Sequence, residues 1–231
     1  MRLRSMLLIP GDRPDDMAKA LEAGADALIL DLEDGVAPAA RPEARRAVTD
    51  FLGRNPGRSL WVRINRLDSH DVDKDLAAVV GARPDGIVLS GAEGGDSVAE
   101  LARRLTERGN VSAMILPMAA DTPSAVLEVG SYAGMKRLAG LTWRSGHLTN
   151  SLGASTPYEE DGSYTAPLEL ARSLCLFGAR AAGVPAIDAA CPVGEDLTRL
   201  KLCAARARRD GFSGMLALEP DQVSVINEAF T

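Results

Sequence analysis

The sequence is poor in the residues from which metal clusters and disulfide frameworks are built. It has two histidines and three cysteines (Cys175, Cys191 and Cys203) among 231 residues. The cysteines are odd in number and have no paired spacing, so we expect neither a zinc knuckle nor a disulfide scaffold. This usage indicates a reducing compartment.

The sequence also lacks a long apolar run and an excess of basic residues. No stretch approaches the ~18–20 apolar residues of a membrane span, and the run from Met6 to Ile9 is too short for a secretion signal. The 26 basic and 32 acidic residues give a net charge of −6. No basic stripe offsets this charge, which argues against a nucleic-acid surface. We expect a cytoplasmic protein that contacts neither membrane nor nucleic acid.

The remaining composition is that of an ordinary globular protein. Hydrophobic residues make up 46% and charged residues 25% of the chain. There is no low-complexity segment and no linker between two hydrophobic units. We therefore expect a single domain over residues 1–231, large enough to bury a sizeable core.

A short apolar run, a polar loop and a helix recur about every 25–30 residues. The apolar runs are 5–9, 27–30, 59–65, 86–89, 112–117, 138–143, 185–188 and 213–218. Helices are expected at 15–22, after 38–42, at 71–80, at 97–108, after 123, and at 167–182, 196–209 and 221–230. Eight such units predict an α/β fold, a single (β/α)8 TIM barrel. An open doubly wound sheet is the alternative, but its Gly-x-Gly-x-x-Gly turn is missing after the first strand.

Two further segments have interpretations of their own. The helix that begins near Pro42 carries Arg41, Arg45 and Arg46, for which a solvated helix face is favoured. The segment 144–162 is long and rich in Gly, Ser and Thr. We expect it to be a loop, and loops of this length are usually functional.

Charged side chains collect where the predicted strands end, which is where barrel enzymes build their sites. The candidates are Asp12, Arg13, Glu33, Asp34, Arg63, Asn65, Glu93, Asp121, His147, Asp188 and Glu219. Arg63 among so many acids suits an anionic substrate held by a guanidinium group. An ion pair of Arg63 with Glu33 or Asp34 is the compatible alternative.

Several candidates have a purely structural interpretation. Asp121 precedes a Thr-Pro pair and is as well placed to cap a helix as to serve a site. His147 is either a satisfied surface residue or a functional one. Asp188 ends an apolar strand, where a buried carboxylate needs partners. Glu219 precedes the last helix, whose N-terminus favours a carboxylate.

Ordered motifs along nearly the whole chain carry a family resemblance. They include Pro10-Gly11-Asp12-Arg13-Pro14, Asp31-Leu32-Glu33-Asp34, Val62-Arg63-Ile64-Asn65, Leu141-Thr142-Trp143, Ala186-Ile187-Asp188 and Gly211-Phe212-Ser213-Gly214. The chain resembles the HpcH/HpaI aldolase and citrate lyase β-subunit family, in its CitE-like branch. The resemblance implies a (β/α)8 barrel and a homo-oligomer, a trimer or hexamer. It also implies cleavage or formation of carbon–carbon bonds in acyl-CoA substrates such as citryl- or malyl-CoA. In the family, Mg2+ sits on a Glu and an Asp, and an arginine holds the substrate carboxylate.

The departures from the family pattern fall on the chemistry. The metal-binding Glu is replaced by Asp121, and the family's Gly-Ala-Glu-Asp-Leu, whose Asp is the other metal ligand, reads Arg144-Ser145-Gly146-His147-Leu148. The family's Pro-Lys after the fourth strand is Ser90-Gly91, and its His-Pro after the eighth is Glu219-Pro220. Mg2+ prefers oxygen ligands in octahedral geometry, whereas imidazole suits softer ions. We therefore expect weak or no Mg2+ binding, with a softer divalent metal as the alternative.

These considerations assign roles to some of the candidates and to Arg144. Catalysis falls to Arg63, Glu33 and Asp34, substrate binding to Arg63, Arg13, Arg144 and Asp188, and metal binding to Asp121 and His147. The predicted function is that of a carbon–carbon lyase acting on a carboxylated acyl-CoA. The alternatives are a non-catalytic barrel that binds an organic acid or a partner protein, and a metal-independent CoA-thioester hydrolase or hydratase. A further hypothesis is that Arg144 replaces the metal with a fixed guanidinium group.

Overall fold

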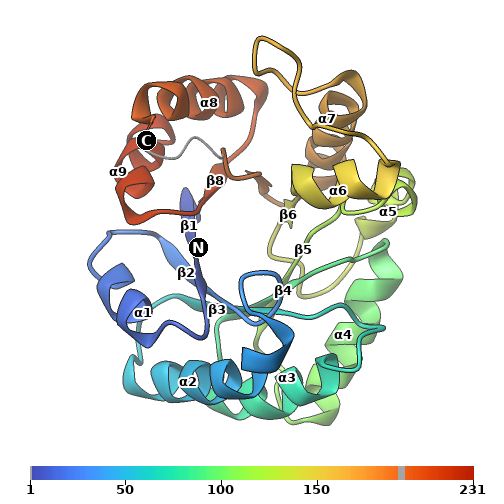
Figure 1. Cartoon of the computed structure of the whole chain (residues 1–231). Helices are drawn as coiled ribbons and strands as arrows, with labels where there is room; N and C mark the ends of the chain where they lie inside the picture. Colours follow the sequence, from blue (N-terminus) through green and yellow to red (C-terminus); the bar gives the residue numbers. More distant parts are fainter. Residues whose placement is uncertain (1, 192–195) are drawn as a thin grey trace.

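The fold is a curled parallel sheet surrounded by helices (Figure 1). The computed structural model describes residues 2–191 and 196–231. Its strands are β1 (Ser5–Pro10), β2 (Ala27–Asp31), β3 (Leu60–Ile64), β4 (Gly86–Leu89), β5 (Met114–Pro117), β6 (Leu141–Thr142), β7 (Ala186–Asp188) and β8 (Gly214–Ala217). Their order is β5-β4-β3-β2-β1-β8-β7-β6. Two parallel bridges, Ile115 to Leu138 and Met118 to Thr142, bring the outer strands together. The predicted α/β barrel is confirmed.

Helices form the outer ring in Figure 1. They are α1 (Pro14–Ala20), α2 (Arg41–Arg54), α3 (Val72–Val79), α4 (Gly95–Glu107), α5 (Pro123–Leu127), α6 (Ser145–Leu152), α7 (Ala166–Ala181), α8 (Leu197–Asp210) and α9 (Pro220–Ala229). Residues 2–191 and 196–231 also contain three short 3-10 turns, Pro38–Ala40, Val80–Ala82 and Val129–Tyr132. Because side chains alternate along a strand, the core has two layers. A small cluster that includes Met6, Ile29 and Trp61 is separate from the larger cluster to which the helices contribute.

The segment predicted as a loop over 144–162 contains a helix. Helix α6 covers Ser145–Leu152 and ends at Gly153, whose φ of 69° is in the left-handed region that glycine adopts readily. Leu148 and Thr149 are buried on one side of this helix. Tertiary packing thus overrides the weak helix propensity of a segment rich in Gly, Ser and Thr.

The prediction that the basic side chains of helix α2 form a solvated face is wrong for Arg45. Arg46 is exposed as expected, but Arg45 is buried and donates to Asp75 and Asp71 over 2.7 Å each. Asp75 also accepts from the backbone and side-chain amides of Asn65. Because a buried charge must be paired, this network ties α2 and α3 to the carboxyl end of β3.

The structure also corrects the expectation about cysteines. Cys191 and Cys203, whose Cα atoms are 6.7 Å apart, form a disulfide, and Cys175 is a buried free thiol. Pairing depends on how the fold places two side chains, which neither the number nor the spacing of cysteines reveals. None of the helices in the described ranges is long and apolar enough to cross a bilayer.

Candidate functional site

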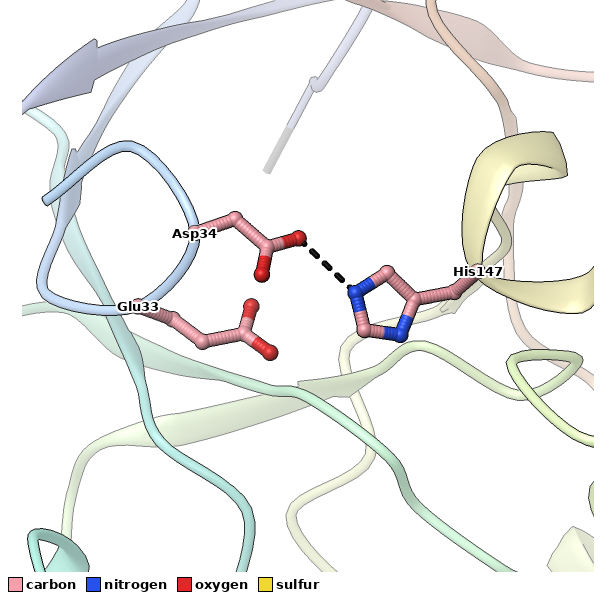
Figure 2. Close-up of side chains that lie close together, drawn as sticks. All are labelled: Glu33, Asp34 and His147. Atoms are coloured by element: carbon pink, nitrogen blue, oxygen red, sulfur yellow. Dashed lines mark ion pairs between the residues drawn. The ribbon is translucent and has the colours of Figure 1, made fainter. Parts of the chain in front are cut away.

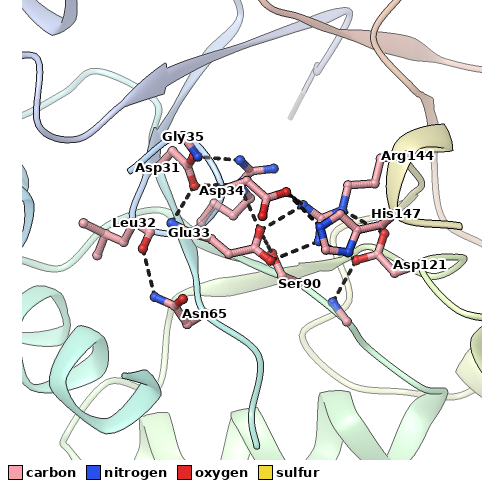
Figure 3. A network of polar contacts seen from close by, with 12 residues as sticks. Asp31, Leu32, Glu33, Asp34, Gly35, Asn65, Ser90, Asp121, Arg144 and His147 are labelled. Carbon is pink, nitrogen blue, oxygen red and sulfur yellow. Dashed lines mark hydrogen bonds and ion pairs between the residues drawn. The ribbon is translucent and has the colours of Figure 1, made fainter. Parts of the chain in front are cut away.

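The carboxyl ends of β2 to β6 bring a cluster of charged side chains together (Figure 3). Asp31 is the last residue of β2, and its carboxylate accepts the backbone N–H groups of Glu33 and Gly35 at 2.9 and 2.6 Å. A side chain at position 35 would place its Cβ 2.5 Å from Asp31 Oδ2, so this tight turn requires glycine. The turn holds Glu33 and Asp34 at the mouth of the barrel.

Arg63, on β3, forms a buried bidentate ion pair with Asp31. Its Nε and Nη2 atoms donate to the two carboxylate oxygens at 2.6 and 2.7 Å. Desolvation lowers the pKa of Arg63, but the hydrogen bonds and charge of Asp31 outweigh it and raise the pKa overall. The ion pair expected for Arg63 exists, but its main partner is Asp31, since Glu33 lies 3.6 Å away. Asp31 was not among the predicted site residues, although it is the first of the acids that follow the apolar run 27–30.

One nitrogen of Arg63 remains open. Nη1 makes no hydrogen bond to any residue in the described ranges, and Arg63 lines a cavity of about 420 Å3. The predicted residue Arg13 lines the same cavity, as do Lys19 and Glu219. Glu219 caps α9 in a capping box with Gln222, as its place before the last helix predicted. The cavity thus combines two guanidinium groups and one ammonium group with an apolar wall and with the carboxylates of Asp16, Asp31 and Glu219.

Arg144 lies at the centre of a second group of charges beside this pair. Its Nε and Nη2 donate to the two oxygens of Asp121 at 3.0 and 2.8 Å. Nη1 and Nη2 donate to the two oxygens of Glu33 at 2.9 and 3.0 Å, and Nη1 also donates to Asp34 at 2.5 Å. A guanidinium group has five N–H donors, and here all five are used. Desolvation lowers the pKa of Arg144, but the charges and hydrogen bonds of Asp121 and Glu33 raise it by more, so the net shift is upward.

The two buried carboxylates of this group have further donors. Ser90 Oγ donates to Glu33 at 2.6 Å, and the backbone N–H of Gly91 donates to Asp121 at 2.9 Å. Asp121 is therefore not the helix cap that its position allowed. The N-cap of α5 is Thr122, whose hydroxyl accepts the N–H of Ala125.

His147 points toward Asp34 (Figure 2). Its Nε2 lies 3.0 Å from Asp34 Oδ2, and both side chains are partly exposed. The hydrogen bond from His147 is the main cause that lowers the pKa of Asp34 to about 2; burial opposes the shift and the charge of Arg144 adds to it. Atoms of Glu33, Asp34 and His147 lie within 4.8 Å of one another, the spacing of a metal site, but Asp121 is not part of that group.

Asp188 belongs to a different network. Its carboxylate is buried and accepts from Arg172 Nε and Nη2 and from Trp143 Nε1, at 2.7 to 2.9 Å for the shortest contacts. Burial raises the pKa of Asp188, and Arg172 opposes this shift. These are the partners that a buried carboxylate needs. The role of Asp188 in substrate binding stays a prediction.

Comparison with known proteins identifies the family. The profile of the HpcH/HpaI aldolase/citrate lyase family matches residues 4–220. The chain belongs to this family. It is 34% identical to a citrate lyase subunit beta-like protein of Mycobacterium tuberculosis over 97% of the chain and 77% of that protein. It is 29% identical to a (3S)-malyl-CoA thioesterase of Cereibacter sphaeroides, over 99% and 77%.

A solved structure of the HpcH/HpaI type superposes closely on this one. It is the protein CitE of Mycobacterium tuberculosis in complex with magnesium, acetoacetate and coenzyme A. The TM-score is 0.87 and the identity 33%, over 98% of this chain and 80% of that one. The family therefore includes members that bind Mg2+, which raises the question of whether this chain has a site for the ion.

Most of the carboxylate oxygens that could bind Mg2+ accept hydrogen bonds within the protein. The ion needs about six oxygen ligands at ~2.0–2.1 Å. Both oxygens of Glu33 and both oxygens of Asp121 already accept from Arg144, and Asp34 Oδ2 contacts Arg144 and His147. A divalent ion at these oxygens would meet the guanidinium charge at contact distance. Mg2+ could bind these oxygens only if the Arg144 side chain moved away from them.

Proposed function

We propose that this HpcH/HpaI family member acts on a carboxylated acyl-CoA of the citryl- or malyl-CoA type at the mouth of the barrel. The observation that carries the proposal is the open Nη1 of Arg63, which keeps two N–H donors at a cavity of about 420 Å3. Asp31 fixes the other side of the guanidinium group, so the donors are pre-oriented for a carboxylate. Arg13 supplies a second positive charge in the same cavity.

The size of the cavity suits the acyl part of such a substrate. Small-molecule pockets are typically about 300–1,000 Å3, and this cavity is near the lower end of that range. It therefore matches a short dicarboxylic acyl group rather than a whole coenzyme. The solved relative with acetoacetate and coenzyme A supports this substrate class.

The first candidate reaction is carbon–carbon cleavage. The hydroxyl proton of the hydroxyacyl group passes to a base, the adjacent carbon–carbon bond breaks, and an oxoacid and the thioester enolate form; the enolate then takes up a proton. His147 is the base we assign, because Nδ1 makes no hydrogen bond to any residue that the structure describes while Asp34 orients Nε2. Arg63 holds the carboxylate during both steps.

Thioester hydrolysis is the second candidate, and the same His147–Asp34 pair favours it. His147 takes a proton from water, the oxygen attacks the thioester carbonyl, and the carbon–sulfur bond breaks to release the thiol, which receives the proton. The similarity to a malyl-CoA thioesterase supports this candidate. We also propose that the chain binds Mg2+ weakly or not at all, because its carboxylate oxygens are committed to Arg144.

Product analysis separates the two reactions. The protein is incubated with malyl-CoA and citryl-CoA, with and without a chelator. Acetyl-CoA and an oxoacid indicate cleavage, whereas free thiol and malate or citrate indicate hydrolysis. Binding by calorimetry without turnover would make the protein a non-catalytic acid-binding barrel, and no binding at all would refute the substrate class.

The expected assembly is also a proposal. We expect a homo-oligomer, a trimer or hexamer, from the family resemblance. Size-exclusion chromatography with light scattering tests this expectation, and a monomer across the concentration range would refute it.

A further inference from the structure

We propose that the guanidinium group of Arg144 is the resident cation of this site and takes the place of a divalent metal ion. The inference rests on the proposed function for the location of the site. Its test measures metal binding, so a wrong substrate class and a wrong inference have different outcomes.

The geometry requires a cation among the three carboxylates. Glu33 and Asp121 are buried and Asp34 is half-exposed, and all three contact one guanidinium group. Without it, the buried carboxylates of Glu33 and Asp121 would face each other with Ser90 and Gly91 as their hydrogen-bond donors, and the nearest positive charge would be Arg63, 3.6 Å from Glu33. Burying unpaired charges is costly, so some positive group must occupy this position.

Arg144 meets this need from within the chain. It stands at the N-cap of α6 with an extended backbone, and Figure 3 shows its side chain directed toward Glu33 and Asp121. Residues 33 and 144 are 111 positions apart in the sequence. The guanidinium group joins the loop after β2 to the loop after β5, which a bound ion would also do.

The hydrogen bonds that Arg144 already makes limit its role. Its five N–H donors are all used, so it offers no donor to a substrate while the cluster is intact. We therefore describe Arg144 as a positioning residue, and the substrate contact that the sequence suggested for it stays an untested prediction. Arg63 pairs with Asp31 and lies near Glu33, and His147 contacts Asp34. The four carboxylates of Asp31, Glu33, Asp34 and Asp121 therefore carry more negative charge than the guanidinium groups of Arg63 and Arg144 carry positive charge.

Removal of the guanidinium group tests the inference. Arg144→Gly, which introduces the residue that the family resemblance gives for this position, should bind Mn2+, followed by loss of the free-ion EPR signal. Its Tm should rise by about 5–10 °C when Mn2+ is ~100-fold above its Kd. The wild-type protein should bind no Mn2+ at the same concentrations, and a chelator should leave its Tm unchanged.

Arg144→Lys is the matched control, because it keeps the positive charge and should not bind Mn2+. Wild-type protein that binds Mn2+ or Mg2+ as tightly as Arg144→Gly would overturn the inference. A folded Arg144→Gly protein that binds no Mn2+, even with His147→Asp added, would also overturn it. If Arg144→Gly does not fold, the wild-type titration and the chelator measurement decide: metal binding refutes the inference and its absence supports it.

Discussion

Removing the Arg63 side chain is expected to destabilise the protein strongly. In Arg63→Met the Asp31 carboxylate, 1% exposed, loses its bidentate partner. Breaking a buried ion pair costs about 3–5 kcal/mol. Asp31 keeps the backbone N–H groups of Glu33 and Gly35, so we expect a loss near the lower limit, about 3 kcal/mol. For a chain of this length, Tm should fall by about 6–12 °C.

Urea unfolding followed by circular dichroism measures this loss. Arg103→Met is the matched control, because Arg103 pairs with Glu100 and Glu107 on an exposed helix face. Its removal should lower the free energy of unfolding far less than the removal of Arg63, because exposed ion pairs contribute little to stability. Arginine and methionine have similar helix propensities, so the control isolates the effect of burial.

A double-mutant cycle with Asp31→Asn separates the pair from its surroundings. We expect a coupling free energy of about 0.5–3 kcal/mol between positions 31 and 63. If Arg63→Met loses no more stability than Arg103→Met, the assignment of a buried, energetically coupled pair is refuted. If the variant folds and keeps the wild-type KM, Arg63 is not the carboxylate anchor.

Three further predictions concern other charged groups. Hydrogen bonds from Arg45 are the main cause that lowers the pKa of Asp71 from 3.8 to about 2; stability should therefore fall as the pH drops from about 4 to 2, and Asp71→Asn should weaken that dependence in urea titrations. His147→Gln should abolish turnover but leave the Kd for substrate within about threefold; unchanged kcat would contradict its role as base. Arg172→Met leaves Asp188 buried without its guanidinium partner and should cost about 3–5 kcal/mol by thermal unfolding; a smaller loss than at an exposed arginine would contradict the pair.

The strands and the family could be recognised from local sequence. The run 27–30, for example, is a continuous apolar segment that leads into acids, and β2 (Ala27–Asp31) contains it. Strand formation depends on neighbouring residues, so a one-dimensional pattern contains the information. The same is true of the proline and threonine that begin α5.

The helix in the segment 145–152 and the cysteine pair could not be recognised in this way. Helix α6 has little propensity of its own, and its formation depends on burying Leu148 and Thr149. Cys191 and Cys203 come together because α8 packs beside the segment that follows β7. Both features depend on packing between elements.

The sequence by itself determined the order of strands and helices, the family, and which residues stand at the strand ends. Only the tertiary structure decided the partners of those residues: Arg63 pairs with Asp31, and Arg144 reaches Glu33 across 111 positions of sequence. The physical reason is the distance along the sequence over which the interactions act. Strand and helix patterns repeat within a few residues, whereas a charge is paired by whatever group the closed sheet brings within hydrogen-bonding distance.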